Sequence, residues 1–159
     1  HDTSIVSAEH RLHMTRLAVA DIDGFEVSDV ELRREGPSYT VDTLEELKGR
    51  FGPGTELFFI LGTDQIHELP TWRDPERIAR LCTLVPVVRP GYPMEDVEGL
   101  KGRLPDHLID TLKANVLEMT PTDVSATDIR RRLAAGEDVK EHVPPEVERY
   151  IREEKLYRQ

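Results

Sequence analysis

One short run in the last third of the sequence places two hydroxyl residues close to a guanidinium. Ser125 and Thr127 stand where a helix is expected to begin, and Arg130 follows about one turn later. Hydroxyls and free backbone N–H groups at a helix start attract anions, and an arginine fork fits phosphate oxygens. The run therefore indicates a phosphate site, although an ordinary capped helix with a basic exposed face fits the same residues.

A second candidate follows residues 56–62, a run that is continuously apolar inside its ends and predicts a strand covered on both faces. Gly62 and Asp64 stand at the carboxyl end of this strand, where ligands lie in open α/β sheets. The glycine would let a ligand approach the backbone, and the carboxylate would accept hydrogen bonds from ribose hydroxyls or amines. A simple turn with Asp64 as the helix N-cap is the alternative.

Trp72 is the only tryptophan and stands in a loop between Pro70 and Pro75. An indole ring held there could stack on a flat heterocycle. Packing into the core is the alternative for this ring.

These candidates must be positioned by helix-like and strand-like segments, which alternate along the chain and predict an α/β fold. The first predicted helix begins after Ser7, and three more cover residues 41–51, 76–81 and 108–113. A fifth starts at Ser125 or Thr122 and ends before Gly136, and the last starts at Pro144-Pro145. The predicted strands are residues 25–32, 56–62, 83–88 and 116–119. Pro86 indicates that its strand is an edge, has a bulge or ends early. Residues 90–106, rich in Gly and Pro, are predicted to form a loop with weak helix at most.

The composition excludes several classes of protein. A length of 159 residues fits one domain, and no apolar run approaches the roughly 18 residues of a membrane span. The net charge of −10, from 21 basic and 31 acidic residues, argues against non-specific binding to nucleic acid or to an anionic membrane. A lone cysteine, Cys82, excludes an intramolecular disulfide framework and a cysteine-based zinc site and favours the cytoplasm.

In their order and spacing these pieces resemble the bacterial nicotinate-nucleotide adenylyltransferases, within the wider group of His-x-Gly-His nucleotidylyltransferases. The similarity runs from Ser7 nearly to the C-terminus. It is carried by residues 7–12, 31–44, 60–64, 69–72, 89–92 and 125–130.

The resemblance implies a Rossmann-like parallel sheet with helices on both faces. It also implies transfer of AMP from Mg-ATP to nicotinate mononucleotide, which gives deamido-NAD and pyrophosphate without a covalent intermediate. By position, the residues expected to bind ATP are Gly62, Asp64, Ser125, Thr127 and Arg130, and those expected to bind the mononucleotide are Thr40, Val41, Trp72 and the backbone of Arg73. Mg²⁺ is expected to arrive with ATP, and no metal site formed by the protein is predicted.

The sequence departs from the family at its start. The family's first strand, with Gly-Gly-Thr-Phe-Asp-Pro and then His-x-Gly-His, is absent here. We therefore expect residues 1–159 to be one nucleotidylyltransferase domain that lacks its first βα unit, with an unpaired edge on its sheet. The family histidines hold ATP phosphates, so no catalytic residue is assigned, and this stretch alone is expected to be inactive.

Two alternatives remain open. The acceptor could instead be nicotinamide mononucleotide or phosphopantetheine, although residues 38–40 and 70–72 favour nicotinate. A chain that truly starts at His1 could be a non-catalytic nucleotide-binding domain. The expected partners are ATP and nicotinate mononucleotide, with no nucleic acid or membrane, and a homo-oligomer is left open.

Overall fold

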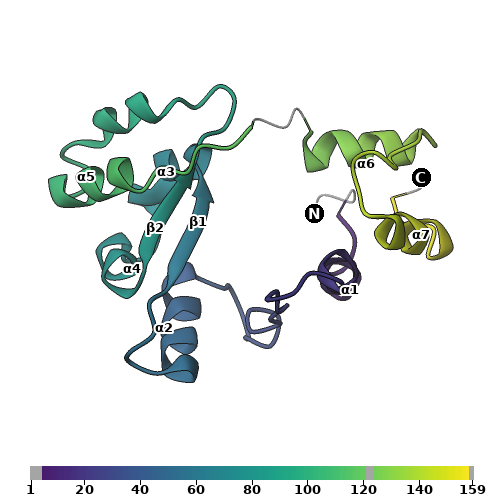
Figure 1. Cartoon of the computed structure of the whole chain (residues 1–159), viewed down its shortest axis with the longest axis horizontal. Helices are drawn as coiled ribbons and strands as arrows, with labels where there is room; N and C mark the ends of the chain where they lie inside the picture. Colours follow the sequence, from purple (N-terminus) through teal and green to yellow (C-terminus); the bar gives the residue numbers. More distant parts are fainter. Residues whose placement is uncertain (1–4, 121–123, 158–159) are drawn as a thin grey trace. The chain divides into compact units, whose positions relative to one another are not determined.

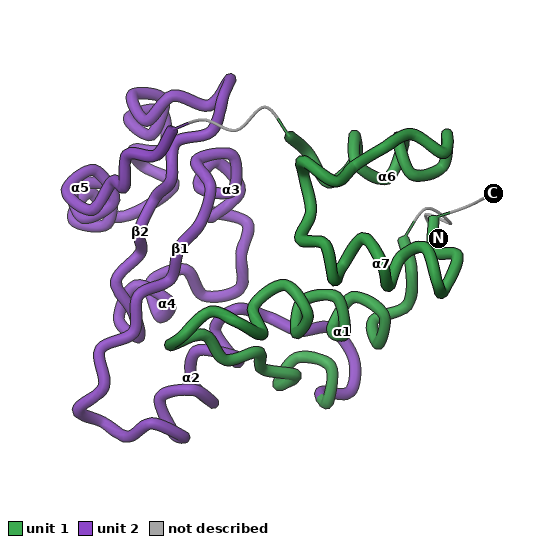
Figure 2. The backbone as a smooth tube through the Cα atoms, turned by 45° about the vertical axis from the view of Figure 1, so that its right-hand side comes forward, with its two compact units in different colours: residues 1–33, 122–159 green, residues 34–121 purple. Residues whose placement is uncertain are grey.

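The computed structural model describes residues 5–120 and 124–157 (Figure 1). His1 and Thr122, which the sequence analysis names, lie outside the described residues. The chain forms two compact units, residues 1–33 with 122–159 and residues 34–121, coloured separately in Figure 2. The single domain over residues 1–159 stays a prediction, and each unit is described here by itself.

A small parallel sheet lies at the centre of the unit formed by residues 34–121. Strands β1 (Phe58–Gly62) and β2 (Thr83–Val87) pair in parallel, from Phe58 opposite Thr83 to Gly62 opposite Val87 (Figure 1). The unit also contains the α-helices α2 (Thr40–Phe51), α3 (Thr63–Glu68), α4 (Pro75–Leu81) and α5 (Asp106–Ala114), and the 3-10 helices η1 (Leu69–Thr71) and η2 (Met94–Leu100). The predicted α/β class is confirmed, as are the helices at 41–51, 76–81 and 108–113.

One face of the sheet packs into the core. Leu61 and Leu84 are almost fully buried there with residues of the surrounding helices, such as Ile66, Ile78 and Leu112. Alternate residues of a strand point to opposite faces, and on the other face Phe58 and Ile60 are each 64% exposed. Within this unit the prediction that residues 56–62 are covered on both faces is therefore wrong, because only the face that carries Phe59 and Leu61 meets the core of the unit.

Pro86 lies on the outer edge of β2. Its carbonyl accepts a hydrogen bond from the Leu117 N–H at 2.8 Å, on the side away from β1. The nitrogen of a strand residue points to the same side as its carbonyl, so the Pro86 nitrogen also faces outward, where it has no hydrogen to donate. The predicted strand 116–119 is consequently reduced to a single bridge between Val87 and Leu117. The edge position predicted for Pro86 is confirmed.

The predicted strand at residues 25–32 is wrong. Local hydrogen bonds form in the second half of this segment: Ser28 Oγ accepts from the Val30 N–H at 3.3 Å, and the Asp29 carbonyl accepts from the N–H groups of Leu32 and Arg33. These bonds form turns, in which serine and aspartate are favoured. The apolar alternation of the segment is thus not used for pairing.

Residues 90–106 are more ordered than the prediction of a loop. They contain η2, and Val97, Leu100 and Leu104 are buried in the core of the unit. The apolar spacing of these three residues outweighs the glycines and prolines between them.

Three helices lie in the described part of the unit formed by residues 1–33 and 122–159, namely α1 (Ala8–Val19), α6 (Ala126–Ala134) and α7 (Pro145–Glu153). Ser7 caps α1 by accepting from the His10 N–H, and Pro144 precedes α7, as predicted. Val147 and Ile151 of α7 form a buried cluster with Leu156, which follows the helix. No described helix of the chain is long and apolar enough to cross a membrane.

Candidate active site

A pocket of about 290 Å³ opens in the unit formed by residues 34–121, where two segments some thirty residues apart in the sequence meet. Its lining residues are Ser38, Tyr39, Thr40, Thr71, Trp72, Arg73 and Ile78. The start of α2 supplies the first three, and the turn before α4 supplies the next three. The structure therefore brings together Thr40, Trp72 and Arg73, three of the four residues predicted to bind the acceptor.

The start of α2 places backbone donors beside this pocket. Tyr39 is the N-cap residue, and its side chain makes no capping hydrogen bond. The first N–H groups of a helix have no intrahelical acceptor, and Thr40 and Val41 carry two of them. The Val41 side chain is only 4% exposed and anchors the helix start in the core. Val41 thus contributes its backbone to this region, while its side chain does not line the pocket.

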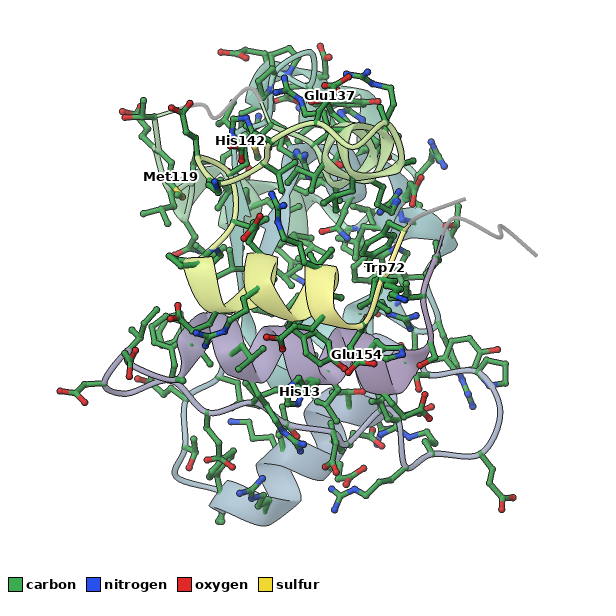
Figure 3. The ribbon with its side chains drawn as sticks, turned by 90° about the vertical axis from the view of Figure 1, so that its right-hand side faces the viewer. His13, Trp72, Met119, Glu137, His142 and Glu154 are labelled. Carbon is green, nitrogen blue, oxygen red and sulfur yellow. The ribbon has the colours of Figure 1, made fainter. Side chains whose placement is uncertain are left out.

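Trp72 combines the two interpretations that the sequence left open. Its ring is half-buried against the core and meets Phe59 edge-on, with ring centroids 6.2 Å apart and an interplanar angle of 68°. The residue also lines the pocket and is labelled in Figure 3. Its backbone is fixed by the 3-10 turn η1, because the Trp72 N–H donates to the Leu69 carbonyl at 3.1 Å. The ring is therefore held in place before any ligand arrives.

The Arg73 side chain lies over the aromatic ring of Tyr39, with its guanidinium carbon 4.8 Å from the ring centroid. Its Nη1 also lies 3.5 Å from Asp42 Oδ2 in the first turn of α2. The sequence analysis assigned neither Tyr39 nor Asp42 a role. Their position next to Thr40 at the start of a helix is the signal that could have found them.

A second group of polar side chains lies beyond the carboxyl ends of both strands. Thr63 and Asp64 follow β1, and Arg89 lies two residues after β2. The Thr63 hydroxyl is fully buried and accepts from the Arg89 N–H at 2.9 Å. Arg89 Nη1 lies 3.7 Å from Asp64 Oδ2. The sequence analysis assigned no role to Arg89, although its place after a strand at the same edge as Asp64 was a usable signal.

Gly62 and Asp64 are brought into close contact. Asp64 Oδ1 is buried and has no hydrogen-bond partner within the described part of the chain. The N-cap of α3 is Gly62 rather than Asp64, and the Gln65 side chain accepts from the Gly62 N–H at 3.3 Å. The alternative in which Asp64 is only a helix cap is therefore wrong, and its carboxylate is left with capacity to accept a hydrogen bond.

The Ser125–Arg130 run lies in the other unit, at the start of α6. Ser125 caps the helix by accepting from the Asp128 N–H at 3.0 Å, and Arg130 Nη2 donates to Thr127 Oγ1 at 3.1 Å. The structure thus brings together Thr127 and Arg130 in the first two turns, beside the Ser125 cap. The predicted N-cap at Ser125 is confirmed.

The three arginines of α6 are used differently. Asp128 binds both Arg131 and Arg132 at 2.7 Å, and these hydrogen bonds, chiefly the one from Arg131, hold the pKa of Asp128 below its usual value. Within the described residues Arg130 forms no ion pair with a carboxylate. Its guanidinium is therefore the one of the three that no described carboxylate binds.

The described ranges 5–120 and 124–157 hold no group of three or more His, Cys, Asp or Glu side chains that could bind a metal ion. The charged side chains at the ends of the strands and at the start of α6 are suited to bind anions and hydroxyls directly.

Comparisons with known proteins identify the family of this chain. The model of the cytidylyltransferase-like family matches residues 1–132. A probable nicotinate-nucleotide adenylyltransferase of Thermus thermophilus is 44% identical over 158 residues, which cover 99% of this chain and 77% of that protein. The protein of the same description from Moorella thermoacetica is 39% identical over 157 residues, covering 99% of this chain and 71% of the relative.

Among solved structures, the Plasmodium falciparum nicotinic acid mononucleotide adenylyltransferase complexed with NaAD is similar in fold. Its TM-score is 0.69 at 17% identity, and the match covers 99% of this chain and 77% of that one. The fold and the family model together define the class, a cytidylyltransferase-like nucleotidyltransferase. Within that class, the identity to relatives over nearly the whole chain shows that the chain belongs to the nicotinate-nucleotide adenylyltransferase family.

Proposed function

We propose that this protein transfers the adenylyl group of Mg-ATP to nicotinate mononucleotide in NAD biosynthesis, giving deamido-NAD and pyrophosphate. The observation that carries the proposal is the pocket in which Thr40, Trp72 and Arg73 converge, in a chain of this family. The pocket combines a fixed aromatic ring with donors from a helix start. These are the groups that a planar pyridine bearing a carboxylate requires.

In this proposal the Thr40 hydroxyl and the N–H groups of Val41 and Arg73 donate to the nicotinate carboxylate. Trp72 stacks on the pyridine ring. A carboxylate accepts from every such donor, whereas a carboxamide presents its own NH₂ group to some of them and leaves donors unsatisfied. The acid is therefore the preferred acceptor.

The ATP side of the proposal uses the remaining predicted residues. Gly62 and Asp64 contact the nucleotide sugar or base, and Ser125, Thr127 and Arg130 hold the phosphates. Mg²⁺ enters as part of the Mg-ATP substrate and neutralises phosphate charge when bound. An oxygen of the mononucleotide phosphate attacks the α-phosphorus in line, and the bond from that phosphorus to the bridging oxygen breaks as pyrophosphate leaves. The chain's own contribution is positioning and charge neutralisation.

The proposal extends to the fold and the location of the protein. The similarity to a solved adenylyltransferase supports a Rossmann-like sheet, completed by helices on both faces, in a single nucleotidylyltransferase domain. The lone, buried Cys82 supports action in a reducing cytoplasm.

The test is turnover of the purified full-length protein with Mg-ATP and nicotinate mononucleotide, followed by chromatography for deamido-NAD and an assay for pyrophosphate. Both products should form in equal amounts. Parallel reactions receive nicotinamide mononucleotide or phosphopantetheine as the acceptor. A higher rate with either of these would move the assignment to another acceptor, and ATP binding without any product would favour a non-catalytic nucleotide-binding domain.

A further inference from the structure

The pocket has a single formal charge in its lining. Of its described lining residues only Arg73 is ionised at neutral pH, the others being serine, threonine, tyrosine, tryptophan and isoleucine. The Arg73 side chain is restrained in position, because its guanidinium lies over the Tyr39 ring and Asp42 binds one of its nitrogens. A cation is therefore held at the pocket by residues that themselves belong to the start of α2.

A second ion pair, similar to that of Arg73 with Asp42, lies about one turn further along α2 and into α4. Arg77 binds Glu45, as Arg73 binds Asp42, so both pairs link the region of α4 to α2. The side chains of the two arginines are similarly exposed, at 59% for Arg73 and 54% for Arg77. Arg77 does not line the pocket. The two arginines thus differ mainly in whether their charge reaches a ligand there.

From this arrangement we infer that the Arg73 side chain is a specificity-determining cation that favours acceptors whose pyridine ring bears a carboxylate over those that bear a carboxamide. The inference rests on the proposed function and goes beyond the backbone N–H that the proposal assigns to this residue. Guanidinium carries five N–H donors in a planar fork, so the contact with Asp42 leaves donors for a second anion. The contact with the Tyr39 ring restrains the position of that fork.

The positive charge of Arg73 attracts the acceptor that bears a carboxylate and has little effect on the one that bears a carboxamide. At a separation of a few ångströms a unit charge in a partly exposed site changes the affinity for an anion by about fivefold, and it leaves a neutral amide almost unchanged. Thr40 and the backbone donors discriminate through unsatisfied hydrogen bonds, which salt does not screen. The part contributed by Arg73 should shrink as ionic strength rises.

The experiment is calorimetric titration of the purified protein and its variants with nicotinate and nicotinamide mononucleotides. Arg73→Gln should weaken binding of the acid by about fivefold and change binding of the amide by less than about twofold. Arg73→Lys should lie between Arg73→Gln and the parent protein, because it keeps the charge but loses the fork. Arg77→Gln, the matched control, should leave both affinities unchanged.

The inference is overturned if Arg73→Gln weakens both mononucleotides equally, if it changes neither, or if Arg77→Gln has the same effect on the acid. It is also overturned if the parent protein does not bind the acid. Turnover with Mg-ATP, measured separately, tests the proposed function. Binding that favours the acid and depends on Arg73 would support the inference even if the protein showed no turnover. Turnover without such a preference would overturn the inference and leave the proposed function in place.

Discussion

Asp64 occupies the space that a side chain at Gly62 would need. A Cβ at Gly62 would lie 2.2 Å from Asp64 Oδ1 and 2.7 Å from Arg89 Cδ. The φ angle of Gly62 is −69°, which any residue can adopt, so packing and not backbone strain excludes a side chain there. Glycine at this position keeps the carboxylate and the guanidinium stem where they are.

Gly62→Ala should therefore disturb the site more than the fold. The atoms that must move belong to two flexible side chains, so we expect a loss of only about 1 kcal/mol in unfolding free energy. We expect ATP affinity to fall by roughly tenfold, since Asp64 is displaced from its proposed contact. Thermal melts and ATP titration measure the two effects. Gly54→Ala is the control, because a Cβ there meets nothing within 4 Å. Unchanged ATP affinity in Gly62→Ala would show that Asp64 does not bind ATP.

Trp72→Ala should weaken both mononucleotides by a similar factor, roughly fivefold, because stacking does not distinguish an acid from an amide. Steady-state kinetics with both acceptors should show a raised KM and a preserved ratio. The contact between Trp72 and Phe59 means that the variant also loses stability. Trp72→Phe keeps an aromatic ring in the core and should recover most of that stability. If KM does not change in Trp72→Ala, the ring serves only packing.

Arg130→Ala should lower turnover at subsaturating ATP by at least about tenfold, which is what a charge-assisted hydrogen bond to phosphate contributes. Arg131→Ala provides the comparison, because the Arg131 guanidinium is bound to Asp128. This second variant should retain most of its activity. Equal activity of the Arg130 variant and the parent protein would show that Arg130 is not a phosphate ligand.

Cys82 should react slowly with thiol reagents in the folded protein. Burial raises the pKa of its thiol to about 11 from an ordinary value of 9.0, and the Sγ–H donates to the Ile78 carbonyl at 3.4 Å. A thiol that stays protonated is a poor nucleophile. Reaction with a disulfide reagent at pH 8 should therefore become fast only when denaturant is added. A fast reaction without denaturant would show that the thiol is accessible.

The same shift predicts how Cys82 affects stability in alkali. The folded state holds the thiol proton of Cys82 more tightly than the unfolded state does. The contribution of the protonated thiol to the free energy of unfolding is therefore present below the unfolded pKa and is lost as pH rises from about 9 through about 11. Denaturant titrations of the parent protein and of Cys82→Ala should converge over this range. A constant difference between them would contradict the shift.

The parts of this structure that follow from neighbouring residues could be predicted from the sequence. The caps at Ser7 and Ser125 and the start of α4 at Pro75 depend on residues within one helical turn. Residues 25–32 show the limit of such patterns, because a strand needs a partner that alternation alone does not provide. Ser28 and Asp29 offered that backbone local hydrogen bonds in its place.

The site was predictable in its residue types but not in its contacts. Thr40 and Trp72 could be named from motifs, whereas the contact between Arg73 and Asp42 depends on α2 packing beside α4. The link from Thr63 to Arg89 likewise exists only because β1 and β2 are parallel and end at one edge. Distances of this kind are set by tertiary packing, which no local spacing encodes.

The outward-facing nitrogen of Pro86 gives the sheet a preferred direction of growth. A further strand laid along β2 would lose a hydrogen bond at that position, whereas β1 contains no proline and can donate from every residue along its outer edge. The segment that does approach β2, at Leu117, forms only a single bridge there, so a longer strand is favoured beside β1. One residue without an N–H thus limits backbone pairing on the β2 side of the sheet.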